Sequence, residues 1–152
     1  MDRVRMGTME VVIFRITEGP EFLVLQRSDS ASPYPGLWQI VSGRIEKREK
    51  APRAAMREVR EETGMLPLEL YNTPLANTFY DAARDAVNLS PVFAALVEAS
   101  AVVILSSEHK AFQWLRRDEA ISRLVWPGQK SAIQVVHDFI VTENPSRDSL
   151  LL

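Results

Sequence analysis

The chain has 152 residues, 46% hydrophobic and 25% charged, which is typical of one soluble globular domain with a buried core. Its formal net charge of −2 excludes a global field that would attract nucleic acid or an anionic membrane, so an anionic ligand needs a local site. The absence of cysteine excludes disulfides, thiolate nucleophiles and zinc–thiolate sites.

The length predicts a single domain over residues 1–142, and residues 143–152 lack hydrophobic periodicity, which predicts a flexible tail. No apolar stretch has the length or flanks of a signal peptide or a membrane span. Together with the missing cysteines, this is compatible with a cytoplasmic protein. We expect neither a nucleic-acid partner nor a membrane partner, and both a monomer and a homodimer remain open.

The first third of the chain predicts strands. Residues 10–17 and 21–27 are rich in β-branched and aromatic residues, and the Glu-Gly-Pro segment between them predicts a hairpin. A polar, proline-containing loop over residues 28–36 leads to a short apolar strand over residues 37–41.

Residues 51–63 predict a helix, because Pro52 suits its first turn and Gly64 suits its C-terminal cap. At 3.6 residues per turn, three glutamates share one face of this helix with three alanines, and we expect that face to be flat and open to solvent. These residues are Glu58, Glu61, Glu62, Ala51, Ala54 and Ala55. Met56, Val59 and Thr63 form a second stripe, which can pack on a core.

The second half of the chain alternates between strand-like and helix-like segments. Strands are predicted over residues 68–71, 87–97, 101–105 and 111–115. A short helix is predicted over residues 118–124, and a longer one over residues 131–141, where Ile133, Val136 and Ile140 recur at helical spacing. Mixed strands with helices before and after them predict an α/β sandwich.

Three carboxylates on one helix face repel one another, and a hard divalent cation such as Mg²⁺ would relieve that repulsion. The same ion binds phosphate oxygens and generates a hydroxide nucleophile from bound water, while a remaining carboxylate can act as general base. A solvated acidic face is the alternative interpretation of the spacing alone.

The segment from Gly43 to Met65 resembles the Nudix box, G-x5-E-x7-R-E-U-x-E-E-x-G-U, in which U is a bulky aliphatic residue. All nine fixed positions match, and a chance match has a probability of roughly 10⁻⁹ per starting point. The matching residues are Gly43, Glu49, Arg57, Glu58, Val59, Glu61, Glu62, Gly64 and Met65. The segment departs from many family members at Ser42, where they have a second glycine, and at Lys47 and Arg48, where they often have proline and glycine.

The resemblance implies a Nudix fold, in which a mixed, curved β-sheet lies between helices. It implies that Glu58, Glu61 and Glu62 bind Mg²⁺, for which Mn²⁺ can substitute, and that one of them acts as catalytic base. It also implies that the backbone carbonyl of Gly43 binds the metal, and that Glu49 and Arg57 form an ion pair that supports the site.

Other site residues lie outside the box. Nudix enzymes often take a further metal-binding acid from the region shortly before a tryptophan-bearing strand, where Glu108 stands six residues before Trp114. The neighbouring His109 is interpreted as a polar loop residue. Candidates for stacking on a base or pterin are Trp38, Tyr80 and Phe79, and candidates for phosphate contacts are Arg27 and Lys130.

The resemblance extends beyond the box and favours a pyrophosphohydrolase. WQIVSGRIE, APRAAMREVREE and EHKAFQWL are similar to dihydroneopterin triphosphate pyrophosphatases, so we expect a nucleoside or pterin triphosphate as the substrate. EHKAFQWLRRDEA is also similar to asymmetric diadenosine tetraphosphate hydrolases, which leaves a dinucleoside polyphosphate as the alternative. A nucleotide-binding sensor without catalysis is the alternative from a different class, although such domains usually lose box glutamates and this chain keeps them all.

Overall fold

The computed structural model describes residues 2–142 and 144–152, which form one mixed sheet with helices on both faces. The strands are β1 (Val4–Arg5), β2 (Thr8–Ile16), β3 (Pro20–Arg27), β4 (Trp38–Gln39), β5 (Val41–Arg44), β6 (Glu69–Asp81), β7 (Ala86–Leu96) and β8 (His109–Leu115). The helices are α1 (Ala51–Thr63), α2 (Arg117–Arg123), α3 (Pro127–Val136), the π-helical turn η1 (His137–Val141) and α4 (Arg147–Leu150).

Strand β2 lies at the centre of the sheet. One of its edges pairs in parallel with β7, and Glu10 lies opposite Val92 there. Its other edge is shared, because the first half pairs antiparallel with β5 and the second half pairs antiparallel with β3. Strand β3 continues the sheet to β4 and β8, and β6 pairs with the outer edge of β7. The strand that contains Gly43 is thereby fixed beside the central strand.

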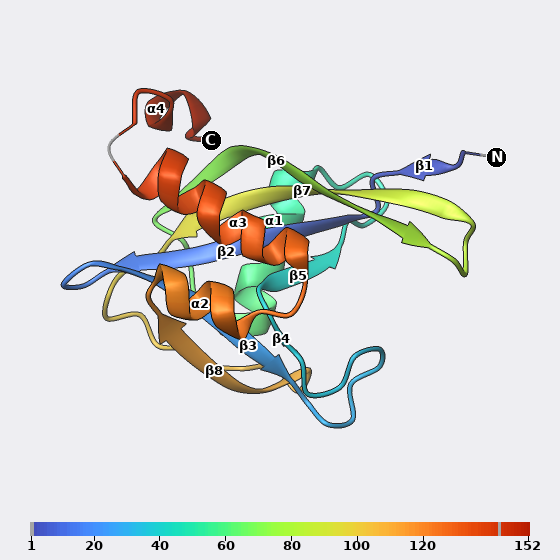
Figure 1. Cartoon of the computed structure of the whole chain (residues 1–152), viewed down its shortest axis with the longest axis horizontal. Helices are drawn as coiled ribbons and strands as arrows, with labels where there is room; N and C mark the ends of the chain where they lie inside the picture. Colours follow the sequence, from blue (N-terminus) through green and yellow to red (C-terminus); the bar gives the residue numbers. More distant parts are fainter. Residues whose placement is uncertain (1, 143) are drawn as a thin grey trace.

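Two hydrophobic cores lie on opposite faces of the sheet, because successive side chains of a strand point to opposite sides. Met9 and Val11 belong to the core that α1 covers, whereas Val12 and Phe14 belong to the core that α2 and α3 cover. In Figure 1, α3 crosses in front of the sheet and α1 lies behind it. The predicted α/β sandwich is confirmed.

Helix α1 begins and ends where the sequence predicts. Pro52 lies in its first turn, and Gly64 ends it in the left-handed conformation, with φ of 70°. The strand predicted over residues 101–105 is wrong: this segment runs without strand pairing, and the Ile104 N–H donates to the Thr63 carbonyl at the end of α1. Its apolar residues pack against the helix end and do not extend the sheet.

Strand β6 is much longer than the predicted segment over residues 68–71. It continues to Asp81 and forms with β7 a hairpin that projects past the N-terminal end of α3 (Figure 1). The pairing of β6 with β7 shifts register between Asn72 and Ala76. This irregularity interrupts the alternation of apolar and polar residues from which a strand would be predicted.

The tail forms the short helix α4, and Leu151 bridges to Tyr71 of β6. Residue 143 lies outside the described residues, and the flexibility of the tail stays a prediction. Within the described part of the chain, no helix has the length and apolar character needed to cross a bilayer.

Candidate active site

Helix α1 places its glutamates at different depths. Ala51, Ala54 and Ala55 are buried in the core, so the expectation that they lie on an open face is wrong. Their small side chains let the helix pack closely on the sheet, and this brings the adjacent glutamates inward. Glu62 is only 4% exposed, whereas the side chain of Glu61 is 58% exposed.

The carboxyl group of Glu58 lies directly against Gly43 of β5. A Cβ atom at position 43 would stand 2.2 Å from the Glu58 carboxyl carbon, so a larger residue would displace the Glu58 side chain. Glycine therefore permits the close approach of this carboxyl group. The structure brings together two residues that the sequence assigns to metal binding.

Arg57 connects the loop before α1 with the glutamates on the helix. Its Nε and Nη2 donate to the two carboxylate oxygens of Glu49, each at 2.9 Å, and Nη2 also donates to the Arg44 carbonyl at 2.8 Å. Nη1 donates to Glu58 at 2.8 Å and to Glu61 at 3.3 Å. Arg57 thereby fixes the loop to the helix and holds two of the three candidate ligands that lie on α1.

The hydrogen bonds with Arg57 change the charge behaviour of its partner. They lower the pKa of Glu49 to about 2, and the backbone N–H of Glu46 contributes in the same direction. In return, the Glu49 carboxylate raises the pKa of Arg57, which stays charged. Both groups are therefore ionised across the neutral range.

Glu62 differs from Glu49, whose two carboxylate oxygens both accept hydrogen bonds from Arg57. Among the described residues, the Oε2 atom of Glu62 is buried without a hydrogen-bond partner. Burial, together with the negative charges of Glu58 and Glu108, raises the pKa of Glu62 to about 9. Burial also raises the pKa of Glu58. An unpartnered carboxylate oxygen beside two other carboxylates is a set of hard oxygen donors that fits a divalent cation.

These side chains do not form a complete metal-coordination site. Across residues 2–142 and 144–152, no three acidic or histidine side chains are already arranged to hold a metal ion. The hydrogen bonds from Arg57 hold Glu58 and Glu61 toward the guanidinium group. A bound cation would compete with Arg57 for these carboxylates.

A polar pocket of about 460 Å³ includes Glu108, whose charge acts on both Glu58 and Glu62. Arg27 lies at the end of β3 and lines this pocket, and its Nε atom is buried without a described hydrogen-bond partner. The lining consists of two arginines, four serines, one glutamate and one alanine: Arg27, Arg44, Ser28, Ser30, Ser32, Ser107, Glu108 and Ala31. Such a surface suits phosphate groups and offers almost no apolar contact to a base.

Sequence reasoning missed most of this lining. Arg44 follows Gly43 directly, and Ser28, Ser30 and Ser32 lie in the loop that was predicted only as polar. The repeated serines of that loop were the available sequence signal for a phosphate pocket. They form such a pocket only together with Ser107, which the fold brings in from a distant part of the chain.

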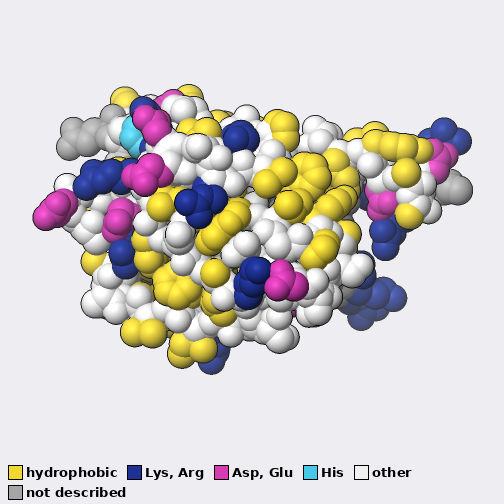
Figure 2. All heavy atoms as spheres, turned by 60° about the horizontal axis from the view of Figure 1, so that its bottom comes forward, with side chains coloured by type: hydrophobic (Ala, Val, Ile, Leu, Met, Phe, Trp, Pro, Cys, Tyr) yellow, Lys and Arg dark blue, Asp and Glu magenta, His cyan; other side chains and the backbone are white. Residues whose placement is uncertain are grey.

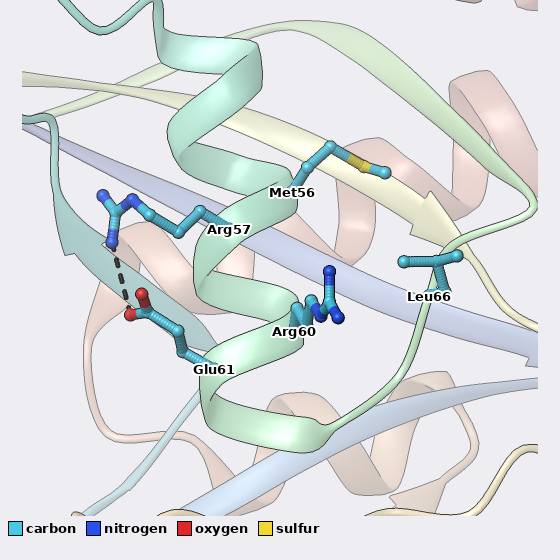
Figure 3. A pocket seen from close by; sticks show the side chains of 5 residues that line it. All are labelled: Met56, Arg57, Arg60, Glu61 and Leu66. Atoms are coloured by element: carbon cyan, nitrogen blue, oxygen red, sulfur yellow. Dashed lines mark hydrogen bonds and ion pairs between the residues drawn. The ribbon is translucent and has the colours of Figure 1, made fainter.

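A second hollow of about 590 Å³ runs along the outer side of α1 (Figure 3). Figure 3 shows Arg57 and Glu61 joined on one side of the helix, with Met56, Arg60 and Leu66 on the other. Neither hollow is lined by Glu58 or Glu62, but the polar pocket is lined by Glu108, whose charge acts on both of them. We therefore place the candidate site at the polar pocket, although it is the smaller of the two.

The predicted stacking residues lie elsewhere. Trp38 is half-buried at the core on the opposite face from α1, and the Arg123 guanidinium stands 5.0 Å above its ring. Tyr80 and Phe79 are exposed on the projecting β6–β7 hairpin, where the Tyr80 hydroxyl donates to Asp85 at 2.9 Å. Their contact with a substrate stays a prediction.

Lys130, a candidate for phosphate contact, and His109, interpreted as a polar loop residue, both make internal contacts. Lys130 Nζ donates to the Ile121 carbonyl at 2.9 Å and joins α3 to α2. His109 is buried, and its Nε2 accepts a hydrogen bond from Gln39 Nε2 at 2.9 Å. Burial lowers the pKa of His109 to about 4, so this side chain is neutral at neutral pH.

The face of the molecule shown in Figure 2 has no area of one charge sign that would replace a local site. On the face shown in Figure 2, lysines and arginines are interspersed with acidic side chains, and no broad area carries one sign of charge. A phosphate ligand therefore depends on groups in direct contact with it.

The comparisons with known proteins identify the family of this chain. The NUDIX domain matches residues 6–139. The chain is 32% identical to an octanoyltransferase of Myxococcus xanthus over 133 residues, which are 85% of this chain but 36% of that protein. It is 30% identical to the asymmetrical bis(5'-nucleosyl)-tetraphosphatase of Rattus norvegicus over 125 residues, which are 79% of this chain and 80% of that enzyme.

A solved structure shows the same fold. The dihydroneopterin triphosphate pyrophosphohydrolase of E. coli superposes with a TM-score of 0.70 and 26% identity, over 89% of this chain and 96% of that enzyme. The box residues, the α1 carboxylates and the match over residues 6–139 lead to one family. This chain belongs to the Nudix hydrolases, which are pyrophosphohydrolases that act on phosphoanhydride bonds.

Proposed function

We propose that this protein hydrolyses a phosphoanhydride bond in a nucleoside or pterin triphosphate, and that it requires Mg²⁺ or Mn²⁺. The observation that carries the proposal is the buried carboxyl group of Glu62, whose Oε2 atom has no hydrogen-bond partner among the described residues. This group lies beside Glu58, near a pocket lined mainly by arginines and serines. The carboxyl groups offer oxygen ligands to a cation, and the pocket suits the phosphates that the same cation would bind.

The proposed metal ligands are Glu58, Glu61, Glu62, Glu108 and the Gly43 carbonyl. When bound, the ion would neutralise phosphate charge and lower the pKa of a water molecule. A carboxylate that does not ligate the ion accepts the proton from that water. This division of roles keeps the catalytic chemistry on α1 and its immediate neighbours.

Several groups around the carboxylates position the substrate. Arg27 and Arg44 provide positive charge for phosphate oxygens, and the serine hydroxyls of the pocket donate hydrogen bonds. Arg57 acts as a positioning residue, because it connects Glu49 and the loop to the glutamates.

A dinucleoside polyphosphate is the second candidate substrate. The rat relative is named as a bis(5'-nucleosyl)-tetraphosphatase, and the match covers most of both chains. Such a substrate also offers several phosphates to the polar pocket, but its second nucleoside needs room outside that pocket. The triphosphate is preferred because the polar lining matches phosphates alone.

Rates under one magnesium condition, with the products resolved, test the proposal. We expect kcat/KM for dGTP or dihydroneopterin triphosphate to exceed kcat/KM for diadenosine tetraphosphate and for ADP-ribose. The Glu62→Gln variant should lose activity, whereas Glu98→Gln, at an exposed position, should keep it. A clear preference for diadenosine tetraphosphate would establish the second candidate, and a preference for ADP-ribose would overturn both.

A further inference from the structure

The sheet face opposite α1 changes from apolar to polar halfway along β2. Val12 and Phe14 are apolar there, and they pack in the core under α2 and α3. Glu10 and Thr8 continue the same face of the strand, because alternate residues share a side. α3 begins close to this change, and in Figure 1 the β6–β7 hairpin continues beyond its N-terminal end.

Further polar side chains surround this half of the face. Ser42 of β5 lies directly opposite Glu10, and directly opposed residues of antiparallel strands point to the same side. Thr8 is hydrogen-bonded to Ser90 of β7, and Asn88 Nδ2 donates to the Thr8 hydroxyl at 2.6 Å. A polar floor therefore extends across three neighbouring strands.

Glu10 is the charged centre of this floor. It is 9% exposed, and its two carboxylate oxygens each accept one hydrogen bond, from Asn77 Nδ2 at 2.7 Å and from Gln129 Nε2 at 2.8 Å. Gln129 is also buried, and its Oε1 accepts the Ile40 backbone N–H at 3.2 Å. Side chains from β2, β6 and α3 therefore converge on one carboxylate.

The partners of Glu10 are neutral amides, and no salt bridge to it is present among the described residues. Burial of a carboxylate in a central strand is costly, so an apolar residue would serve the core better unless the charge has a use. A carboxylate accepts about four hydrogen bonds, and the two amides take two of them. Capacity for further donors remains.

The cluster reaches the surface at the start of α3. Asn77 and Ser42 are half-buried, and Asn77 fills the space beside Gly128, where an added Cβ would stand 2.7 Å from its side chain. Trp126 lies at the same end of α3, and its ring meets Tyr34 edge-on at 5.0 Å. Exposed aromatic rings at the end of α3 that provides Gln129 suit a flat heterocycle.

We propose that Glu10, with Asn77 and Gln129, recognises the 2-amino-4-oxopyrimidine edge that guanine and pterins share. This edge presents a ring N–H next to an exocyclic amino group, and a carboxylate can accept from both donors at once. Adenine presents an amino group next to a ring acceptor, which a carboxylate repels. Glu10 therefore selects against adenine as well as in favour of guanine or a pterin.

This inference rests on the proposed function only for its kinetic readout. Wild-type kcat/KM is compared for GTP, for inosine triphosphate, which lacks the exocyclic amino group, and for ATP. We expect GTP to exceed inosine triphosphate and ATP by about 10- to 100-fold, because a buried acceptor loses a donor in each of the poorer substrates. Dihydroneopterin triphosphate, measured alongside, separates a pterin substrate from a guanine nucleotide.

The Glu10→Gln variant replaces one acceptor with a donor at nearly constant shape. It should bring the ratio of kcat/KM for GTP over inosine triphosphate close to one, while Glu21→Gln, at a half-buried position paired with Arg15, should leave the ratio unchanged. Equal efficiency for GTP and inosine triphosphate in the wild type would overturn the inference, and it would leave the proposed hydrolysis intact.

Equilibrium binding of GDP and inosine diphosphate to the wild type gives a readout that needs no turnover. Tighter binding of GDP supports the inference, even if neither triphosphate is hydrolysed and the proposed function fails. Equal binding of the two diphosphates contradicts the inference. Because these comparisons use the wild-type protein, the inference remains testable if Glu10→Gln does not fold.

Discussion

Glu62 and Glu10 are both buried glutamates, yet their surroundings differ. Among the described residues, Glu62 has one oxygen without a hydrogen-bond partner and lies near other carboxylates, whereas Glu10 accepts hydrogen bonds from two amides. Repelling carboxylates are complementary to a cation, and a carboxylate held by neutral donors is complementary to further donors. The type of neighbour, more than burial, therefore distinguishes a proposed metal site from a proposed base site.

The largest effect is expected for Glu62→Gln. Turnover should fall by about 10²- to 10⁴-fold, because the variant removes a proposed metal ligand or general base. Stability in chelator should hold, since the raised pKa of about 9 keeps Glu62 protonated at neutral pH and glutamine is its neutral counterpart. Thermal unfolding with chelator and rates with Mg²⁺ check both points. Near-normal turnover would remove Glu62 from the site.

Gly43→Ala tests the contact between β5 and α1. The added methyl group would stand 2.2 Å from the Glu58 carboxyl carbon and must displace it. We expect a loss of turnover of about 100-fold, because a small misplacement of a catalytic group is costly. Gly7→Ala is the matched control, since its nearest contact would be an ordinary 3.4 Å. Equal rates for the two variants would show that Glu58 tolerates the displacement.

Arg57→Ala tests whether the loop and the helix act as one unit. We expect activity to fall by about 10- to 100-fold, as for residues that orient metal ligands, together with a lower free energy of unfolding. A double-mutant cycle with Glu49→Ala measures the coupling in urea unfolding. Strictly additive effects would mean that the hydrogen bonds at 2.9 Å contribute nothing to stability.

The smallest expected effect concerns acid stability. The folded protein lowers the pKa of Glu49 from 4.5 to about 2, so its ionised form favours folding. This contribution is fully present above pH 4.5 and is lost as the pH falls toward 2. Urea unfolding at pH 6 and pH 3 should show a smaller pH dependence for Glu49→Gln than for the wild type. An identical dependence would contradict the assignment.

The sequence predicted the helix that carries the glutamates with the correct bounds, because Pro52 and Gly64 mark its two ends. It did not predict that Ala51, Ala54 and Ala55 are buried, since small residues suit both an open face and a close helix–sheet contact. The depth of Glu62 follows from that contact. Spacing alone places the three glutamates on one face of the helix, but the packing of the helix on the sheet determines the solvent exposure of each.

The substrate-binding groups were less predictable. The polar pocket draws residues from the end of β3, the following loop, β5 and the turn before β8, and only the folded chain brings these segments together. The sequence did not predict the burial of Glu10, because a single polar residue in a strand-like segment is normally exposed. Its burial depends on Asn77 and Gln129, which are distant in the sequence.

The most direct test of the central claim is the initial rate of triphosphate hydrolysis as Mg²⁺ is added to chelator-treated protein. The carboxylates of α1 predict a rate that rises from background, saturates with Mg²⁺ and returns to background with excess chelator. The Glu98→Gln control should follow the same curve, and Glu62→Gln should stay near background at all Mg²⁺ concentrations. Undiminished turnover in excess chelator would contradict the account.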